Sequence, residues 1–301
     1  MSTLRGLDKK AFVTHIDDVE WIEVSEGFRI KKLLCQKTAG KTEFYFGMAE
    51  LAPGKSIPPQ KANLSCCTNI LKGRVWARLG RQRFELEEGA SNYFPAGLPH
   101  AYEASGDQGV TFVFCYATDN PIGEDLKIEA VSEEECRAYY QPNCPSNLMS
   151  PGTEGTGCRW ATAADTDPWV IVEAAQGTRS QMFRAHFDEI KGCKELWWGV
   201  CTTRPNCRYT PHFHEQAEIF YILSGHGTMY GGSEIFQVRP GSLLYAPSNC
   251  MHGMVNDGND DLLALYCCSI ETVGTAYNRE EVADVPIVAP ADRTDLMLSK
   301  V

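Results

Sequence analysis

The sequence predicts an all-β protein built from two tandem copies of one barrel or sandwich. The first observation is an internal repeat: shifted by 152 residues, the two halves of the chain align without a gap across their middles. The second is a series of short β-branched and aromatic runs at about ten-residue spacing, with Gly and Pro turn signals between them. Helix signals are few, and we expect short helices only near 132–137 and 278–282.

The repeat preserves residues that shape the backbone. Aligned pairs include Pro59 with Pro211, Gly73 with Gly225, Gly89 with Gly241, Pro95 with Pro247 and His100 with His252. A constant offset through so many turn residues indicates a duplicated domain. We therefore expect an N-terminal barrel over 1–140, a connection rich in Pro, Gly, Thr and Ser over 141–168, and a C-terminal barrel over 169–301.

The strands are clearest in the second copy. A run over 218–223 ends at Gly225, and a second over 228–230 leads into Gly231-Gly232, the dipeptide of a tight hairpin. Runs over 235–238 and 242–245 follow. These elements predict a sheet of short antiparallel strands.

The composition and charge of the chain limit its expected partners and location. The 301 residues carry a net charge of -11 at pH 7, which disfavours nucleic acid and anionic membranes as partners. No run of about 18 apolar residues is present, and the start of the chain lacks an apolar signal region, so we expect a cytoplasmic protein. The 13 cysteines contain no C-x-x-C pair, and we expect most of them to be buried thiols.

The segment around 211–218 carries the chemistry. His212, His214 and Glu218 share a parity, and side chains alternate between the two faces of a strand. Two imidazoles and a carboxylate can therefore converge on one face. Such a set is typical of a transition-metal site.

At this point the chain resembles the cupins. Residues 212–225 match their first motif, His-x-His, three residues, Glu, six residues, Gly, and 241–256 match their second, except that Asn249 stands where Gly is usual. Asn is the residue best able to replace Gly in a left-handed turn. The resemblance implies two jelly-roll barrels, with His212, His214, Glu218 and His252 holding one divalent transition metal per chain. Ligand type leaves Fe, Mn, Zn, Ni and Co open.

The N-terminal copy has lost these ligands. Gln60 stands at the position of the first His, Ala62 at the second and Cys66 at the Glu, so only His100 remains. We expect this barrel to be structural, with metal-free ligand binding as the alternative.

Polar and aromatic residues near the motif are further candidates. We expect Tyr245 and Tyr221 to act with Glu218 in catalysis, because a phenol near a metal can serve as acid, base or orienter. Arg208, Tyr230 and Trp198 are the candidates for substrate binding.

The resemblance leaves the reaction open. The first hypothesis is redox-neutral chemistry (isomerisation, decarboxylation, elimination or hydrolysis) on a small oxygen-rich acid or sugar-like metabolite. The second is an Fe(II)-dependent dioxygenase with an aromatic or dicarbonyl substrate, in a pocket with Met229, Met251 and Met254. The third is a non-catalytic binding protein. A small molecule is the expected partner, and a homodimer is an expected assembly.

Overall fold

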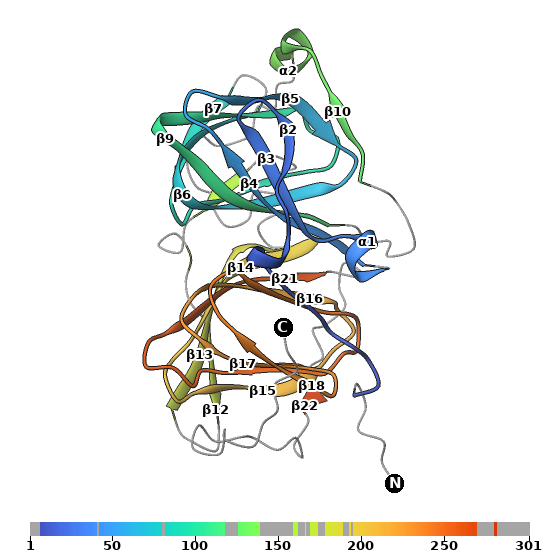
Figure 1. Ribbon diagram of the computed structural model, residues 1–301, viewed down its shortest axis with the longest axis vertical. Coiled ribbons are helices and arrows are strands. Elements are labelled where there is room, and N and C mark those ends of the chain that lie inside the picture. Colours follow the sequence, from blue (N-terminus) through green and yellow to red (C-terminus); the bar gives the residue numbers. More distant parts are fainter. Residues whose placement is uncertain are drawn as a thin grey trace. The chain divides into compact units, whose positions relative to one another are not determined.

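The computed structural model describes residues 7–40, 42–79, 82–117, 126–138, 159–161, 166, 169–173, 178–188, 193, 195–269 and 280–281. The chain forms two compact units. The N-terminal barrel comprises Val19–Thr166 and His186–Trp197, and the C-terminal barrel comprises Met1–Asp18, Asp167–Ala185 and Trp198–Val301. Each unit is a curled β structure (Figure 1). The all-β prediction is confirmed.

The units differ from the expected ranges at two places. Residues before Val19 belong with the C-terminal barrel, and His186–Trp197 belong with the N-terminal one. Two hydrogen bonds join this segment to the N-terminal barrel: Tyr93 donates to Glu195 at 2.7 Å, and His186 lies 2.8 Å from the Ser91 hydroxyl. Most of the connection expected over 141–168 lies outside the described residues.

A 10-stranded sheet forms the N-terminal barrel, in the order β11-β8-β6-β9-β4-β3-β2 with β5, β7 and β10 joined at its sides. Its strands are β2 (Ile22–Ser25), β3 (Phe28–Leu34), β4 (Phe44–Leu51), β5 (Ser56–Ala62), β6 (Ser65–Leu79), β7 (Gln82–Glu87), β8 (Ser91–Phe94), β9 (His100–Ala117), β10 (Ile128–Ala130) and β11 (Arg159–Ala161). The long strands β6 and β9 pair along most of their length and curl the sheet around an apolar core.

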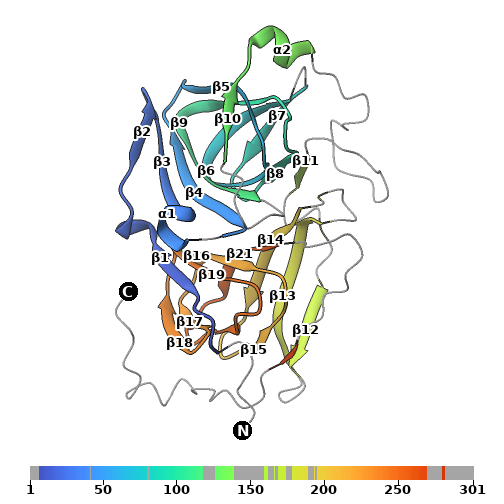
Figure 2. The same ribbon diagram turned by 90° about the vertical axis from the view of Figure 1, so that its right-hand side faces the viewer.

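Two sheets form the C-terminal barrel. The first has the order β1-β19-β16-β21-β14-β13-β12 and the second β18-β17-β20-β15-β22 (Figure 2). The strands are β1 (Phe12–His15), β12 (Trp169–Glu173), β13 (Thr178–Phe187), β14 (Leu196–Thr203), β15 (Arg208–Phe213), β16 (Glu218–Ser224), β17 (Gly227–Gly231), β18 (Glu234–Val238), β19 (Ser242–Ala246), β20 (His252–Val255), β21 (Leu262–Ser269) and β22 (Glu280–Glu281). The expected hairpin turn lies between β17 and β18, with Gly232 at φ 63°.

The repeat is visible strand by strand. The bounds of β4 and β14 differ by the same 152 residues that align the sequence, and both strands have the same alternation of buried and half-buried positions. The continuous β6 corresponds to the separate strands β16 and β17. The duplication therefore reproduces the fold while changing where strands break.

The first strand of the chain completes the C-terminal barrel. β1 pairs antiparallel with β19, from Phe12 opposite Tyr245 to His15 opposite Ser242. The ring of His15 is buried and hydrogen-bonds the carbonyl oxygen of Pro240 at 2.9 Å. Since β1 covers the outer side of β19, it removes an unpaired strand edge that could otherwise pair with another chain.

Helices are short within the described residues. They are η1 (Ile16–Asp18), α1 (Gln36–Ala39) and α2 (Glu133–Ala138). The helix expected near 132–137 is confirmed as α2, whereas the one expected at 278–282 is wrong for Glu280–Glu281, which form β22 beside β15. Pairing with an open strand overrides the local helix signal there.

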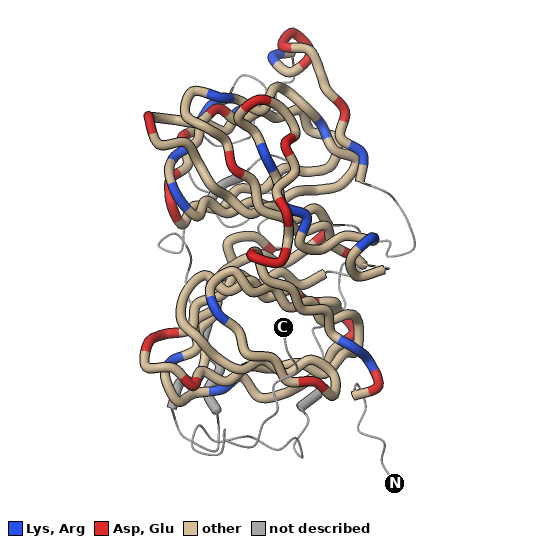
Figure 3. Tube along the Cα trace, viewed as in Figure 1, with Lys and Arg blue, Asp and Glu red and all other residues tan. Residues whose placement is uncertain are grey.

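Charged residues of both signs are interspersed over each barrel in the view of Figure 3. Among the described residues, no helix is long and apolar enough to cross a membrane. Nine of the eleven described cysteines are buried, as expected, and all eleven are free thiols.

Candidate metal centre

Three strands of the C-terminal barrel bring the predicted ligands together. His212 lies near the end of β15, Glu218 begins β16 and His252 begins β20. His212 and His252 are direct partners across the β15–β20 ladder. His214 follows β15 in the short connection to β16. The adjacent strands β15 and β20 of one sheet thus deliver His212 and His252, and β16 of the other sheet delivers Glu218.

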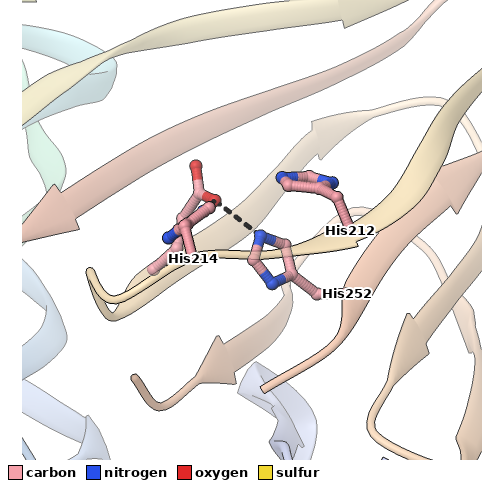
Figure 4. Close-up of side chains that lie close together, drawn as sticks. His212, His214 and His252 are labelled. Atoms are coloured by element: carbon pink, nitrogen blue, oxygen red, sulfur yellow. Dashed lines mark hydrogen bonds and ion pairs between the residues drawn. The ribbon is translucent and has the colours of Figure 1, made fainter. Parts of the chain in front are cut away.

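The four side chains converge closely. Their ligand atoms all lie within 4.8 Å of one another, and all four residues are buried. The imidazole rings of His212 and His252 have centroids 4.4 Å apart, and those of His214 and His252 4.8 Å apart. Figure 4 shows His212, His214 and His252 close together, with a dashed line for the contact of His252 with Glu218. Within the described part of the chain this is the one such group of His, Cys, Asp and Glu.

Backbone carbonyls orient two of the imidazoles. Nδ1 of His212 lies 2.9 Å from the carbonyl oxygen of Thr210, and Nδ1 of His252 lies 2.9 Å from that of Cys250. A carbonyl accepts only, so each Nδ1 carries a proton and each Nε2 is directed into the site. Nε2 of His252 there donates to Glu218, and release of that proton would free its lone pair for a metal. The bond from Nδ1 to a carbonyl is the usual way in which proteins fix a metal-binding His.

Glu218 is held as a carboxylate. Burial raises its pKa, but hydrogen bonds from His214 at 3.2 Å and His252 at 2.8 Å outweigh burial and bring the pKa to about 2. Two thiols lie near this charge: burial first, and then the charge of Glu218, raise the pKa of Cys201 and of Cys268. These cysteines therefore remain neutral beside the carboxylate.

The residues fit a divalent transition metal. Three imidazoles and one carboxylate supply a compact set of nitrogen and oxygen donors, with the orientation of two imidazoles fixed by the backbone. A metal held there would act as a Lewis acid on substrate oxygens. Without a metal, two imidazoles share one carboxylate oxygen, an arrangement that a cation would replace.

Strand register corrects the placement of Tyr221 and Tyr245. Phe220 has its ring 6.1 Å from that of His252, so the even-numbered residues of β16 face the ligands. Tyr221 therefore faces the other side, and Tyr245 pairs with Ile219 on that same side. Neither phenol shares the sheet face of Glu218, which argues against the catalytic roles expected of them.

The same reasoning moves Arg208 and Tyr230 away from the ligands. Arg208 pairs with Val255, and Tyr230 pairs with Gly253. Along β20, Gly253 and Val255 face the side of the sheet opposite to His252. Tyr230 packs in a cluster with Phe213, Met251 and Val255. Both side chains thus belong to the opposite face of this sheet, and the expected substrate-binding roles are not supported.

Trp198 is fully buried in β14. The nearby charge of Glu218 affects Cys201, so this thiol lies on the ligand side of the strand. Alternation then places Trp198, three residues earlier, on the other side. Its expected contact with substrate is therefore not supported either.

Other residues occupy the ligand face. Tyr209 has its ring 4.4 Å from that of His212, because a bulge between Tyr209 and His212 changes the alternation. Met254 shares the face of His252, and Thr203 and Gln181 both donate to its sulfur, at 3.2 Å and 3.5 Å. Sequence reasoning missed these roles, since neither the bulge nor the neighbours of β20 can be read from spacing.

The turn before β20 uses Asn249 as expected. This residue has φ 59°, in the left-handed region, and its N–H donates to the carbonyl oxygen of His214 at 2.8 Å. Asn is among the few non-Gly residues that adopt this conformation at low cost. The turn therefore links the two ligand-bearing segments.

Comparison with known proteins now identifies the fold family. The family model described as Cupin domain matches residues 47–116 and 199–268, two ranges separated by the offset of the internal repeat. The chain is a bicupin. Its C-terminal metal motif is intact and its N-terminal one is degenerate, as the sequence predicts.

Two curated proteins resemble parts of this bicupin. An uncharacterized protein of Methanocaldococcus jannaschii is 44% identical over 52 residues, which cover 17% of this chain and 41% of that protein. An auxin-binding protein of Nicotiana tabacum is 30% identical over 82 residues, 24% of this chain and 44% of that protein. Both matches span less than half of those relatives.

Solved structures share the whole bicupin architecture. A variant of Bacillus subtilis oxalate decarboxylase superposes with a TM-score of 0.67 at 16% identity, covering 96% of this chain and 84% of that one. A second structure of that enzyme, described for its Mn(II) centres, gives a TM-score of 0.64 at 14% identity, covering 91% and 79%. At this identity the likeness concerns the fold.

Proposed function

We propose that the protein is a metal-dependent enzyme whose C-terminal barrel performs redox-neutral chemistry on a small oxygen-rich acid. The observation that carries the proposal is the convergence of three imidazoles and one carboxylate within 4.8 Å in a buried site. Such a site binds a metal that can chelate and polarise carboxylate or hydroxyl oxygens. Isomerisation, decarboxylation, elimination and hydrolysis all use this polarisation.

Decarboxylation is the first reaction to test. The bicupins that superpose on this chain are forms of oxalate decarboxylase, an enzyme with Mn(II) centres. The donor set here suits Mn(II) as well as Fe(II), Co(II), Ni(II) or Zn(II). We therefore propose a small carboxylic acid as substrate and Mn(II) as the first metal to supply.

We assign substrate positioning to the residues on the ligand face. Tyr209 lies directly against His212, with the two rings 4.4 Å apart, and brings a phenol to the ligands. Gln181 is buried beside Met254, and its Oε1 accepts no hydrogen bond from the described residues. A buried amide oxygen without a donor is costly, and a substrate hydroxyl could satisfy it.

A second candidate is oxygen-dependent cleavage of an aromatic substrate. Met229 and Met254 are cross-strand partners on the ligand face, where Phe220 also lies. This apolar wall suits an aromatic ring better than a small hydrophilic acid. Of the three methionines expected in such a pocket, Met251 belongs instead to the opposite face.

One experiment separates these candidates. Protein purified without oxygen is loaded with Mn(II) or Fe(II) and given a panel of small carboxylic acids and phenols, while CO2 release and oxygen uptake are followed. CO2 release without net oxygen uptake supports decarboxylation, whereas stoichiometric oxygen consumption with Fe(II) supports the second candidate. No turnover with either metal would indicate a binding protein.

The His252→Ala variant is the control, because it removes a ligand of the C-terminal site. His100→Ala is its match, since the same change falls on the equivalent residue of the N-terminal barrel. Turnover must disappear in the first and persist in the second. Association with a homodimer partner remains a prediction, which light scattering of the same samples checks.

A further inference from the structure

The N-terminal barrel encloses a cavity of about 610 Å³. All the described residues that line it belong to this barrel. Pockets for small organic ligands typically have about 300–1,000 Å³ and mostly apolar walls with few polar groups. The walls here follow that pattern, with Phe28, Phe46, Phe112 and Phe114 among the lining side chains. A barrel without metal ligands therefore retains room for a molecule.

The buried end of the cavity holds an oriented imidazole. Gln60 and His100 are partners across the β5–β9 ladder, as His212 and His252 are in the other barrel. Nδ1 of His100 lies 2.9 Å from the carbonyl oxygen of Leu98 and donates to it, so Nε2 keeps its lone pair. Burial lowers the pKa of His100 to about 4, and the ring is neutral at pH 7.

No metal can be expected at this position. Ala62 offers no donor, and the thiol of Cys66 donates to the carbonyl oxygen of Cys67. Burial raises the pKa of Cys66, which keeps it from becoming a thiolate ligand. Nε2 of His100 makes no hydrogen bond within the described residues and is thus an acceptor in an apolar cavity.

Two hydroxyls beside the imidazole are also oriented. Tyr102 donates to Oδ1 of Asn92 at 3.0 Å, and Thr68 donates to the same oxygen. Thr68 and Tyr102 both line the cavity, and the protons of their hydroxyl groups are engaged with Asn92. The buried end consequently presents acceptor atoms, which favour a ligand that carries an N–H or O–H donor.

The open end has a different character. Lys32 and Lys37 are exposed lining residues, and no Asp or Glu is among the described residues that line the cavity, although the chain has a net charge of -11. Val24 and Ile128, at 52% and 47% exposure, are two of the three most exposed large apolar side chains among the described residues. This rim is suited to an anionic group attached to an apolar body.

We propose that the N-terminal barrel is a second, metal-independent binding site for an aromatic organic anion with an N–H or O–H donor. The anion lies between Lys32 and Lys37, the ring lies among the phenylalanines, and the donor reaches Nε2 of His100. The site is separate from the C-terminal metal centre and does not depend on the function proposed there.

Anilinonaphthalene sulfonate has all three features and becomes fluorescent in apolar surroundings. We expect saturable binding of one molecule per full-length chain, with displacement by para-hydroxyphenylacetate. Loss of binding in His252→Ala would place the probe in the C-terminal barrel and overturn the proposal. Binding that never saturates would also overturn it.

Variants test each end of the site. K32Q/K37Q should weaken para-hydroxyphenylacetate roughly 2- to 30-fold and leave its neutral amide unaffected, because exposed ion pairs contribute about 0.2–1 kcal/mol each. Lys55→Gln, which removes a surface lysine paired with Glu26, is the matched control. Equal affinities in K32Q/K37Q and Lys55→Gln would contradict the anion subsite.

His100→Phe keeps the aromatic stack on Phe94, where the rings are 4.2 Å apart, and removes the acceptor. It should weaken para-hydroxyphenylacetate roughly 3- to 10-fold and leave phenylacetate, which lacks the donor, unchanged, as expected for one neutral hydrogen bond. Equal effects on both compounds would contradict the donor subsite. Circular dichroism of each variant confirms folding.

Discussion

His212 and His252 face each other directly across the β15–β20 ladder, and each donates from Nδ1 to the carbonyl oxygen two residues before it. The same bond recurs at His100 in the N-terminal barrel. The duplication has therefore kept the device that orients the imidazole in both barrels, while only the C-terminal barrel has kept the other ligands. The roles of these histidines can be separated by substitution.

Substitution of either ladder histidine should empty the metal site. We expect His212→Ala and His252→Ala to retain less than about one tenth of the bound metal after dialysis, since a lost ligand or its support commonly costs 10- to 100-fold in affinity. Elemental analysis measures this, and circular dichroism confirms the fold. His100→Ala is the control, and metal loss in that variant would contradict a single site in the C-terminal barrel.

The tyrosines on the two sheet faces should behave differently. Tyr209→Phe should reduce turnover while the metal content is unchanged, because Tyr209 lies against His212. Tyr245→Phe and Tyr221→Phe should leave turnover within about 2-fold of the parent, because loss of one hydrogen bond on the opposite face acts mainly on stability. Burial raises the pKa of Tyr221, so it stays protonated in any case. If Tyr245→Phe lost turnover while Tyr209→Phe kept it, the assignment of Tyr209 to the ligand face and of Tyr245 to the opposite face would be reversed.

The turn at Asn249 allows a test of backbone strain. Asn249→Ala should cost about 1–2 kcal/mol because of its positive φ, and lower the melting temperature by roughly 2–8 °C. Asn249→Gly should melt within about 2 °C of the parent, since Gly adopts this conformation freely. Thermal unfolding followed by circular dichroism measures both. Equal melting of the Ala and parent proteins would show that the turn tolerates a left-handed Ala.

Thiol reactivity should follow burial. Among the described cysteines, Cys35 and Cys207 are half-exposed and should react with iodoacetamide in the native protein. Cys250 should stay unmodified even at pH 9, because burial raises its pKa to about 12 and the thiolate is the reactive form. Mass spectrometry of labelled peptides reads out each site. Rapid native labelling of Cys250 would show that this turn opens to solvent.

Some of the site could be predicted because it depends on spacing within one strand or turn. The glycines and prolines of the repeat locate the ends of strands, and the motif spacing identifies His212, His214 and Glu218 as a group. The expectation that these three share one strand face is wrong, because His212 lies on β15, His214 follows it and Glu218 begins β16 in the other sheet. Asn249 in the left-handed turn is confirmed. Turns and strand ends depend on residues that are close together in the sequence, so they can be predicted from it. The internal repeat shows the same pattern of turn residues a second time.

The faces of Tyr245, Arg208 and Tyr230 could not be predicted in this way. Each depends on which residue lies opposite on the neighbouring strand, and a one-residue change of register moves a side chain to the other face. Tyr209 reaches the ligands through a bulge, which inserts a residue that alternation does not anticipate. Pairing of β1 with β19 joins residues more than 200 positions apart, and no local pattern indicates it.

That pairing has a consequence for synthesis of the protein. Phe12–His15 leave the ribosome long before Ser242–Ala246, the strand that they must meet. At about 5–20 residues per second the interval is on the order of tens of seconds. During this interval the N-terminal barrel can fold while β1 stays an unpaired strand, and the C-terminal barrel closes only after β19 has been synthesised. A chain released before β1 and β19 pair would expose two complementary strand edges, that of β1 and that of β19.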